Sequence, residues 1–526
     1  MMKRIFLIGS ALLSFILANA QNDLDALRVS QNFYGGTARF QSMGGAFGAL
    51  GGDFSSLTTN PAGLGVYRSS ELVFTPTLMK NVTETSYLGS TNDDFEYNFN
   101  INNFGYVAHI DVNSSGWKGF NFGIGFNRLN NFHQNTVIHT PSAEGSLLDE
   151  FVLLANGSED IPIPPSYYYE GMAMGGEGIY LYDHTTGNTI AGKQSESNPD
   201  GFTDKEISEI PLYENMEYMN DFLYYAFVDG NELVYGQSLR KSYFNQGKLS
   251  EFVISGAGNY SDKLYIGATV GIQRFRFENT ILHTESTDGS AFQAIYDPND
   301  RVYFKSYDFE ENNNTWGTGF NFKFGLIYKP INMLRLGAAI HSPTVQRMES
   351  EFSTKMETFY YDGSNVLSRS DLAVNEYRIY TPFKAIGSIG IQIQKIALIS
   401  LDYEYMDYSN MRFKSDGEDF SDLNNSMSST FKAVHNIRAG AEVRLGTFAL
   451  RGGIAYYDNP YSSSSDNELT TILYTGGAGI NYKTVKFDVG YVMSVSEYST
   501  APYLTSELAD VNSTTNKFIA TIAFRF

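Results

Sequence analysis

Apolar and polar positions alternate along much of this chain, most clearly in residues 517–526. The apolar side chains of that stretch occupy every second position, at Phe518, Ala520, Ile522, Phe524 and Phe526. Successive side chains of a β-strand point to opposite faces, so this pattern predicts a strand with one apolar face. Alternating or aromatic-rich segments predict strands near 71–82, 100–111, 119–131, 248–259, 264–277, 317–329, 333–345, 381–393, 396–411, 430–445, 448–459, 470–482, 485–497 and 516–526.

Short and long connections alternate between these predicted strands. Tight turns such as 259–263 and 329–332 follow the even-numbered strands, and longer polar stretches such as 83–99 follow the odd-numbered ones. Barrels of bacterial outer membranes have short periplasmic turns and long outer loops. We therefore predict an all-β fold, a transmembrane antiparallel β-barrel of about 14 strands with both termini periplasmic. The longest connection, about 133–247, is predicted to form an extracellular cap over the barrel mouth.

The start of the chain has the features of a secretory signal peptide. Basic residues at 3 and 4 precede the apolar run 5–17, and small residues follow at 18–20. This order predicts export and cleavage before Gln21. No later stretch approaches the roughly 18 consecutive apolar residues that a membrane helix needs. The chain has no cysteine, which excludes disulfides and thiolate metal sites.

Composition and charge narrow the class further. Aromatic residues make up 15% of the chain and glycine occurs 49 times, which suits a barrel with aromatic girdles and crowded strands. The formal net charge of −21 argues against a nucleic-acid partner, because phosphates need a basic surface. We therefore expect the chain in the bacterial cell outer membrane, in contact with outer-membrane lipid and lipopolysaccharide.

Residues 21–67 do not alternate and precede the first predicted strand. They are rich in glycine and end near Asn60-Pro61-Ala62-Gly63-Leu64. A barrel of about 14 strands has a lumen that its own side chains cannot fill, so this segment is predicted to fold back as a plug, or hatch. We expect short helices at 47–50 and 54–59, and a turn or helix stop at Asn60-Pro61. The predicted domains are the signal peptide 1–20, the hatch 21–67 and the barrel 68–526.

Three motifs, in this order along the chain, resemble the FadL/TodX family of outer-membrane transporters of hydrophobic compounds. The first is the glycine-rich hatch with its Asn-Pro-Ala element at 60–62. The second is the stretch 330–344, which contains Leu-Arg-Leu-Gly-Ala at 334–338 and His-Ser-Pro-Thr at 341–344. The third is 450–460, similar to the family's late Arg-Gly-Tyr-Pro strand. One departure is Tyr408, which precedes Ser409 where many relatives have Trp.

The resemblance implies transport of a hydrophobic small molecule such as a long-chain fatty acid. Outer loops would capture the ligand, the hatch would rearrange, and the ligand would leave sideways into the membrane. An apolar solute gains free energy when it leaves water for an apolar groove or for lipid. The residues assigned to the hatch and its gating are Asn60, Pro61, Ala62, Gly63 and Leu64. Asn60 is predicted to fix the hatch conformation, because a buried amide needs hydrogen-bond partners.

Further candidates for ligand contact come from side-chain periodicity. In the hatch, helix-like spacing selects Phe47, Leu50, Phe54 and Leu57. The alternative for this stripe is packing against the barrel wall. In the wall, strand parity points five basic side chains into the lumen, namely Lys323, Arg335, Arg438, Arg451 and Arg525. Of these, Arg335 and Arg438 are the candidates for binding a carboxylate, and salt bridges or a solvated lumen are the alternative.

Other functions remain open at this point. An enzyme is not expected, because the seven histidines are scattered without a Ser-His or His-x-x-x-His spacing. His133 and His139 leave a haem-binding receptor as one alternative, and a shuttle that holds exported proteins is another. No cofactor and no metal are expected. We expect a monomer, and we expect the barrel assembly machinery to recognise the terminal Phe526.

Overall fold

The computed structural model describes residues 23–112, 114, 116–148, 150–151, 169, 181–183, 188–191, 228–229, 232–233, 236–287, 293–297, 300–417, 419–463 and 468–526. The predicted signal peptide and most of the predicted cap at 133–247 lie outside the described residues. Among the described residues, no helix has the length and apolar character that a membrane crossing requires.

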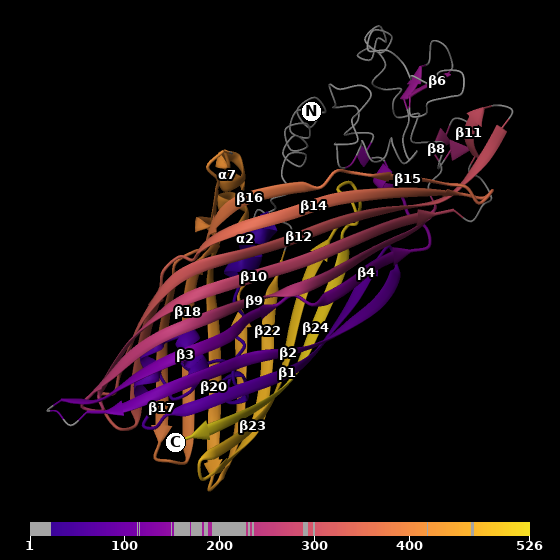
Figure 1. Cartoon of the computed structure of the whole chain (residues 1–526). Helices are drawn as coiled ribbons and strands as arrows, with labels where there is room; N and C mark the ends of the chain where they lie inside the picture. Colours follow the sequence, from indigo (N-terminus) through magenta and orange to yellow (C-terminus); the bar gives the residue numbers. More distant parts are fainter. Residues whose placement is uncertain are drawn as a thin grey trace.

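The chain forms a closed antiparallel barrel with 14 wall positions (Figure 1). Closure comes from β1 (Glu71–Tyr87), which pairs with β2 (Ser90–Asp111) on one side and with β24 (Ala509–Arg525) on the other. Further wall strands are β3 (Trp117–Asn131), β9 (Ser238–Tyr260), β10 (Leu264–Ser286), β12 (Asp300–Tyr328), β20 (Ala433–Leu445), β21 (Phe448–Tyr457), β22 (Thr470–Tyr482) and β23 (Val485–Thr500). The predicted fold class is confirmed.

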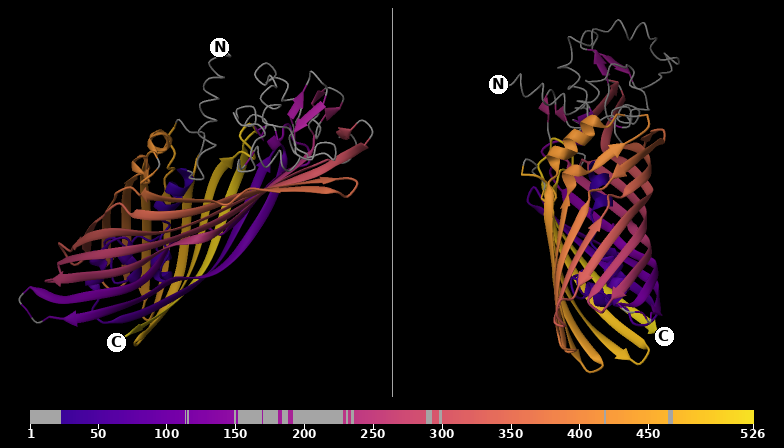
Figure 2. Two further views of the ribbon diagram at one scale, coloured as in Figure 1. Left: turned by 45° about the horizontal axis from the view of Figure 1, so that its top comes forward. Right: turned by 90° about the vertical axis from the view of Figure 1, so that its left-hand side faces the viewer.

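Three wall positions each hold two strands placed end to end. These pairs are β13 (Leu334–His341) with β14 (Val345–Tyr360), β17 (Lys384–Ile393) with β16 (Ala373–Tyr380), and β18 (Ala397–Asp407) with β19 (Arg412–Lys414). Shorter elements add to the rim or join wall strands, namely β4 (Gln134–Thr140), β5 (Leu181–Asp183), β6 (Asn188–Ala191), β7 (Val228–Asp229), β8 (Glu232–Leu233), β11 (Gln293–Asp297), β15 (Asn365–Arg369), η4 (Tyr408–Asn410) and α7 (Ser421–Thr430). Figure 2 shows that β9, β10, β12 and β14 slant strongly and extend past the rest of the wall at one end.

The outer and inner faces of the wall differ in polarity as the alternation predicts. On β24, Phe518 and Phe524 are exposed on the outer face, whereas Ile519, Thr521 and Ala523 are buried toward the lumen. The same parity buries many polar side chains inside, including Asn321, Glu404 and Arg438. An apolar outer face and a polar inner face are the arrangement of a barrel that has lipid outside.

The N-terminal segment folds inside the barrel through four short helices. They are α2 (Asp23–Ser30), α3 (Ala38–Gln41), η1 (Phe54–Thr58) and η2 (Pro61–Val66). Apolar side chains from this segment and from the wall form several buried clusters, and the largest contains Phe40, Phe47 and Leu50 of the segment with Phe275 and Met348 of the wall. The main core of the molecule therefore lies in the lumen, between residues 23–67 and the wall.

One detail of the predicted hatch is wrong, and another is incomplete. Residues 47–50 form turns, not a helix, because Gly44, Gly45, Gly51 and Gly52 on either side adopt positive φ angles between 63° and 73°. Asn60-Pro61 does not only stop a helix. Asn60 is the N-cap of η2, its side chain accepts a hydrogen bond from the Ala62 amide, and Pro61 occupies the first helical position.

The wall strands are longer than predicted on the side of the long connections. Residues 83–99, predicted as a loop, continue β1 and β2 to a tight turn at Leu88 and Gly89, whose φ angles are 43° and 76°. The prediction stopped early because it relied on a contrast between an apolar and a polar face. That contrast is lost within residues 83–94, where outward positions such as Glu84, Ser86 and Asp93 are polar like most of the inward ones.

Candidate functional site

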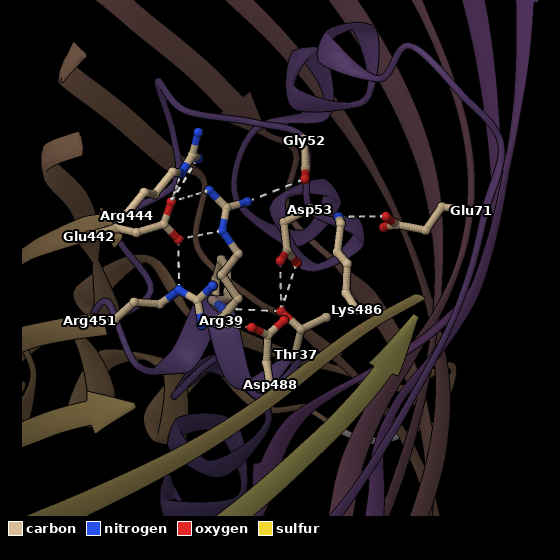
Figure 3. Close-up of polar contacts among 11 residues, drawn as sticks. Thr37, Arg39, Gly52, Asp53, Glu71, Glu442, Arg444, Arg451, Lys486 and Asp488 are labelled. Atoms are coloured by element: carbon tan, nitrogen blue, oxygen red, sulfur yellow. Dashed lines mark hydrogen bonds and ion pairs between the residues drawn. The ribbon is translucent and has the colours of Figure 1, made fainter. Parts of the chain in front are cut away.

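One side of the hatch is attached to the wall by buried ion pairs (Figure 3). The carboxylate of Glu442 on β20 accepts hydrogen bonds from Arg39 of α3 at 2.8 Å and from Arg451 of β21 at 2.7 Å. Arg444 donates to the same carboxylate at 2.7 Å. Arg451 also pairs with Asp488 of β23 at 2.7 Å. We call Arg39, Glu442, Arg444, Arg451 and Asp488 the ionic cluster.

Each member of the ionic cluster has an oppositely charged partner within the protein. The side chains of Glu442 and Arg451 are 1% and 2% exposed, and the Arg39 side chain is 13% exposed. Charge-assisted hydrogen bonds of this kind are about twice as strong as neutral ones, and removing one partner leaves a buried charge without compensation. Arg39 therefore connects the hatch firmly to β20 and β21.

A carboxylate of the hatch itself, Asp53, holds together the backbone around residues 37 and 55 (Figure 3). It accepts hydrogen bonds from the Thr37 hydroxyl at 2.8 and 2.9 Å and from the Ser55 amide at 3.0 Å. Burial raises the pKa of Asp53 above its usual value, and nearby Arg39 and the Thr37 hydrogen bond oppose that rise. Asp53 thus joins residues 37 and 55 and caps η1.

Asn60 attaches the hatch to a different part of the wall. Its Nδ2 donates to the Gly48 carbonyl at 2.6 Å within the hatch and to the Leu326 carbonyl of β12 at 3.1 Å. Its Oδ1 accepts from the Ala62 amide at 3.0 Å. The arrangement has the form that the sequence predicted, a buried amide whose donors and acceptor are occupied. Its part in gating stays a prediction.

Apolar residues hold the hatch on the side of β2 and β3. Phe54 lies against Gly105 of β2 and Gly125 of β3, where an added Cβ would come within 2.5 and 2.7 Å of its ring. Leu57 and Leu64 lie against Gly123 of β3, with corresponding distances of 3.2 and 3.3 Å. The wall glycines therefore form the surface that receives these side chains.

The structure also places the other candidates for ligand contact. Phe47 is buried against Phe40, with ring centroids 5.2 Å apart, and Leu50 is buried against Gly390 of β17. With Phe54 and Leu57 they all contact hatch or wall, which is the packing alternative. A role in ligand contact remains a prediction for these four residues.

The two candidate arginines do lie in the lumen, and each has a protein partner. Arg335 of β13 donates to the Leu50 carbonyl at 2.5 Å and to Gln392 at 3.1 Å. Arg438 of β20 donates to Glu404 at 3.0 Å and lies 4.9 Å from the centre of the Tyr34 ring. Arg438 thus forms an ion pair and Arg335 contacts the hatch, as the alternative expected. Binding of a ligand carboxylate by either arginine stays a prediction.

The wall is interrupted between β2 and β3, a feature that the sequence analysis did not locate. The β2–β3 ladder runs only from Asn103↔Asn127 to Asp111↔Gly119. Beyond it β3 has a bulge at Arg128 and Asn130 and pairs with β9 alone. We call the place between residues 98–102 of β2 and 128–131 of β3 the wall gap.

Side chains and the hatch, not a backbone ladder, occupy the wall gap. Arg128 Nη2 donates to the Ile101 carbonyl at 3.3 Å, and Asn131 Nδ2 donates to Asn98 Oδ1 at 3.0 Å. On the lumen side the amides of Gly35 and Phe33 donate to the carbonyls of Arg128 and Leu129 at 2.8 and 3.0 Å. The hatch is thus hydrogen-bonded directly to the strand that borders the gap.

The histidines of the alternative readings have local partners. His133 Nδ1 lies 2.8 Å from Asn131 Oδ1, and His139 Nδ1 donates to the Leu239 carbonyl at 2.9 Å. Within the part of the chain that the structure describes, no three His, Asp or Glu residues are grouped as metal ligands would be.

Comparison with known proteins adds evidence on the fold. No protein-family model matches the chain, and no curated protein matches its sequence. Among solved structures, a Pseudomonas aeruginosa FadL homologue aligns over 94% of this chain and 99% of its own, with a TM-score of 0.52 and 12% identity. The P. putida toluene transporter TodX aligns over the same shares, with a TM-score of 0.51 and 12% identity.

This chain has the FadL/TodX fold. The resemblance predicted from three motifs is thereby confirmed at the level of architecture. At this identity, the residues that act on a ligand must be found from the contacts of this chain. In this example of the FadL/TodX fold, the hatch contacts and the wall gap are the features that can carry function.

Proposed function

We propose that this chain transports hydrophobic compounds such as long-chain fatty acids across a bacterial outer membrane. Ligand enters from the outer loops, the hatch rearranges, and ligand leaves sideways through the wall gap into lipid. Both termini are periplasmic in this arrangement. The proposal draws support from solved structures of the same fold, which include a toluene transporter.

The observation that carries the proposal is the contact between the hatch and the wall gap. Gly35 and Phe33 form backbone hydrogen bonds with β3 at the bulge where its pairing with β2 has ended. A movement of the hatch at these residues therefore changes the edge of the gap directly. The outer face of β2 beside the gap is apolar, with Phe99 and Ile101 71% and 37% exposed, so a ligand that leaves there meets a hydrophobic surface.

A reversible cross-link tests whether the hatch must move. The chain has no cysteine, so an introduced pair reacts only with itself. A Cβ built on Gly390 lies 3.4 Å from the Cβ of Ala49, close to the separation of about 3.8 Å found in disulfides. Ala49→Cys with Gly390→Cys should therefore attach the hatch to β17 under oxidation.

Uptake of radiolabelled oleate is measured in cells that lack the native gene and express this pair. We expect little uptake in the oxidised state and recovery after reduction, while each single cysteine variant behaves the same in both states. Equal uptake in both states of the fully cross-linked protein contradicts hatch movement. Normal oleate uptake in the deletion strain together with a secretion defect favours the shuttle alternative, and lipase or protease turnover that one Ser or His substitution abolishes favours an enzyme.

A further inference from the structure

The outer face of the wall carries a group of exposed basic side chains on neighbouring strands. The strands β9, β10, β12 and β14 lie side by side in the wall (Figure 1), and β16 and β19 continue the same ladder. The basic side chains are Lys248 of β9, Arg274 and Arg276 of β10, Arg347 of β14, Arg378 of β16 and Lys414 of β19. We call these six residues the basic row.

The register places like charges of the basic row directly opposite each other. Arg347 pairs with Arg378, and Arg378 pairs on its other side with Lys414. On the other side of β12, Arg276 lies opposite Lys248. Like charges at directly opposite positions of a ladder destabilise a sheet. Three such pairs on one face therefore need compensation by negative charge.

Carboxylates of the protein supply only part of this compensation. The ion pairs of the row are Arg276 with Glu278, Arg347 with Glu376 at 3.0 Å, and Arg378 with Asp416 at 2.9 Å. Lys414 lies 5.0 Å from the centre of the uncharged Tyr380 ring. Among the residues that the structure describes, the side chains of Arg274 and Lys248 have neither a hydrogen bond nor an ion pair. These three cations are available to a partner outside the chain.

Another part of the wall shows that the basic row is a local feature. The structure describes every residue of β20, β21, β22, β23 and β24, and no outward position of these strands holds lysine or arginine. Exposed residues there include Tyr456, Tyr474 and Tyr491. The formal net charge of the chain is −21, so a basic patch runs against the composition. The basic row thus marks one side of the barrel.

The basic row begins where the apolar outer surface ends. On β10 the outward residues before Arg274 are all apolar, namely Leu264, Ile266, Ala268, Val270 and Ile272. The segment 264–272 has about the length with which a tilted strand crosses hydrocarbon. Trp316, opposite Arg276 in the register, is 37% exposed and belongs to an interfacial aromatic girdle. The basic row therefore lies at the level of lipid headgroups.

We infer that the basic row binds the phosphates of a glycolipid of the outer leaflet, the lipid A part of lipopolysaccharide. The inference rests on the orientation given in the proposed function, which places the short turns in the periplasm, and it does not depend on the transported compound. Arginine and lysine donate charge-assisted hydrogen bonds to phosphate. Arg274 and Arg347 are two strands apart, about 10 Å, so one headgroup can reach both. Phe320 and Phe322 of β12, 54% and 64% exposed, provide apolar surface for the acyl chains.

The test measures binding of diphosphoryl lipid A to purified full-length protein in detergent by native mass spectrometry. Arg274→Gln with Lys248→Gln removes two charges that have no partner in the fold. We expect this double variant to bind lipid A about tenfold more weakly, because exposed charge pairs contribute modestly and two are lost. Lys263→Gln with Lys395→Gln is the matched control, since it removes the same charge from two short turns. The control should bind lipid A as wild type does.

Two further lipids identify the group that is recognised. Lipid A without phosphate keeps the acyl chains, and phosphatidylglycerol keeps one phosphate without the sugar headgroup. We expect wild type to bind diphosphoryl lipid A about tenfold more tightly than either, because several charge-assisted hydrogen bonds are then formed together. Equal affinity for the dephosphorylated form, or equal lipid A affinity in wild type and the folded double variant, overturns the inference. Equal affinity for phosphatidylglycerol shows a site for any lipid phosphate and overturns the assignment to a glycolipid.

The orientation is tested separately, which distinguishes failure of this inference from failure of the proposed function. The chain has no cysteine, so Lys263→Cys in a short turn is the single target for a membrane-impermeant maleimide. We expect no labelling in intact cells and labelling after the outer membrane is opened. Labelling in intact cells reverses the orientation and overturns both proposals. Loss of lipid A specificity with the expected labelling overturns the glycolipid site alone and leaves transport standing.

Discussion

The hatch is held by different chemistry on two sides of the lumen. Toward β20, β21 and β23, Arg39 enters an ionic cluster whose charges are paired and, apart from Arg444, largely buried. Toward β2 and β3, Phe54 and Leu57 lie against wall glycines, and the polar contacts are two backbone hydrogen bonds to the bulge at Arg128. The wall gap is also on this second side.

This difference indicates which side of the hatch is fixed and which can move. The hydrogen-bonded ion pairs of the ionic cluster need a defined geometry, and separating them leaves buried charges without compensation. This side of the hatch therefore resists displacement. Apolar side chains against glycine lose less when they slide, because dispersion contacts are numerous and individually weak. We therefore expect the hatch to pivot about the ionic cluster while its contacts with β3 change. Four substitutions test this expectation.

Glu442→Gln should have the largest effect. It leaves Arg39, Arg444 and Arg451 without their shared carboxylate, and breaking a buried pair costs about 3–5 kcal/mol. We expect a lower unfolding temperature in detergent and new ion conductance in planar bilayers, because the hatch no longer seals the lumen. Glu376→Gln is the control, since its pair with Arg347 is exposed and worth at most about 1 kcal/mol. Conductance and stability equal to wild type contradict a fixed ionic side.

Asn60→Ala should come next. The substitution removes the donor to the Gly48 and Leu326 carbonyls and the cap of η2, which leaves buried groups unpaired at a cost of about 1–3 kcal/mol. Faster proteolysis within residues 23–67 is the expected readout. Asn60→Asp keeps the acceptor for Ala62 but loses the donors, so a similar result for both variants assigns the effect to the donors. Protection equal to wild type in Asn60→Ala shows that the amide does not hold the hatch.

Gly35→Ala tests the movable side. An added Cβ would lie 2.6 Å from the Arg128 carbonyl oxygen, and overpacking of this kind costs about 1–3 kcal/mol, part of which small shifts relieve. We expect the hatch to separate from β3 and the gap to open more often. An Asn102→Cys reporter at the wall gap should then react faster with a maleimide. Gly387→Ala, where a Cβ meets nothing within 4 Å, is the matched control. A reaction rate that Gly35→Ala does not change contradicts coupling between hatch and gap.

The sequence predicted the parts of this arrangement that depend on local periodicity. Strand positions and the inward direction of Lys323, Arg438 and Arg451 follow from a repeat of two, which the closed wall preserves. The N-terminal segment could be predicted as a plug because its glycines and the width of the lumen are independent of any particular contact.

The contacts that distinguish the two sides could not be predicted in this way. Arg39 and Glu442 are separated by 403 positions, and nothing in the alternation says which inward acid meets which hatch base. The bulge at Arg128 interrupts the repeat of two for a single step, which is within the scatter of ordinary strand ends. The turns at 47–50 were mistaken for a helix because apolar spacing reports burial, whereas the flanking positive-φ glycines decide the backbone.

Asp53→Asn should have the smallest effect. It tests whether the ionised Asp53 carboxylate stabilises or destabilises the folded hatch. Because burial raises the pKa of Asp53 in the folded state, the folded protein holds a proton more tightly than the unfolded chain. Its ionised form is therefore a cost above the raised pKa, and stability increases as pH falls from the raised pKa toward the ordinary value of 3.8. Asparagine keeps an acceptor for Thr37 or Ser55 without the charge, so stability at neutral pH should change by no more than about 1 kcal/mol.

The difference in unfolding free energy between wild type and variant, followed with pH, isolates this group from the other carboxylates. Wild type that loses stability relative to the variant as pH falls through that window shows that the ionised carboxylate, with Arg39 beside it, stabilises the hatch, and the ionic side then extends to Asp53.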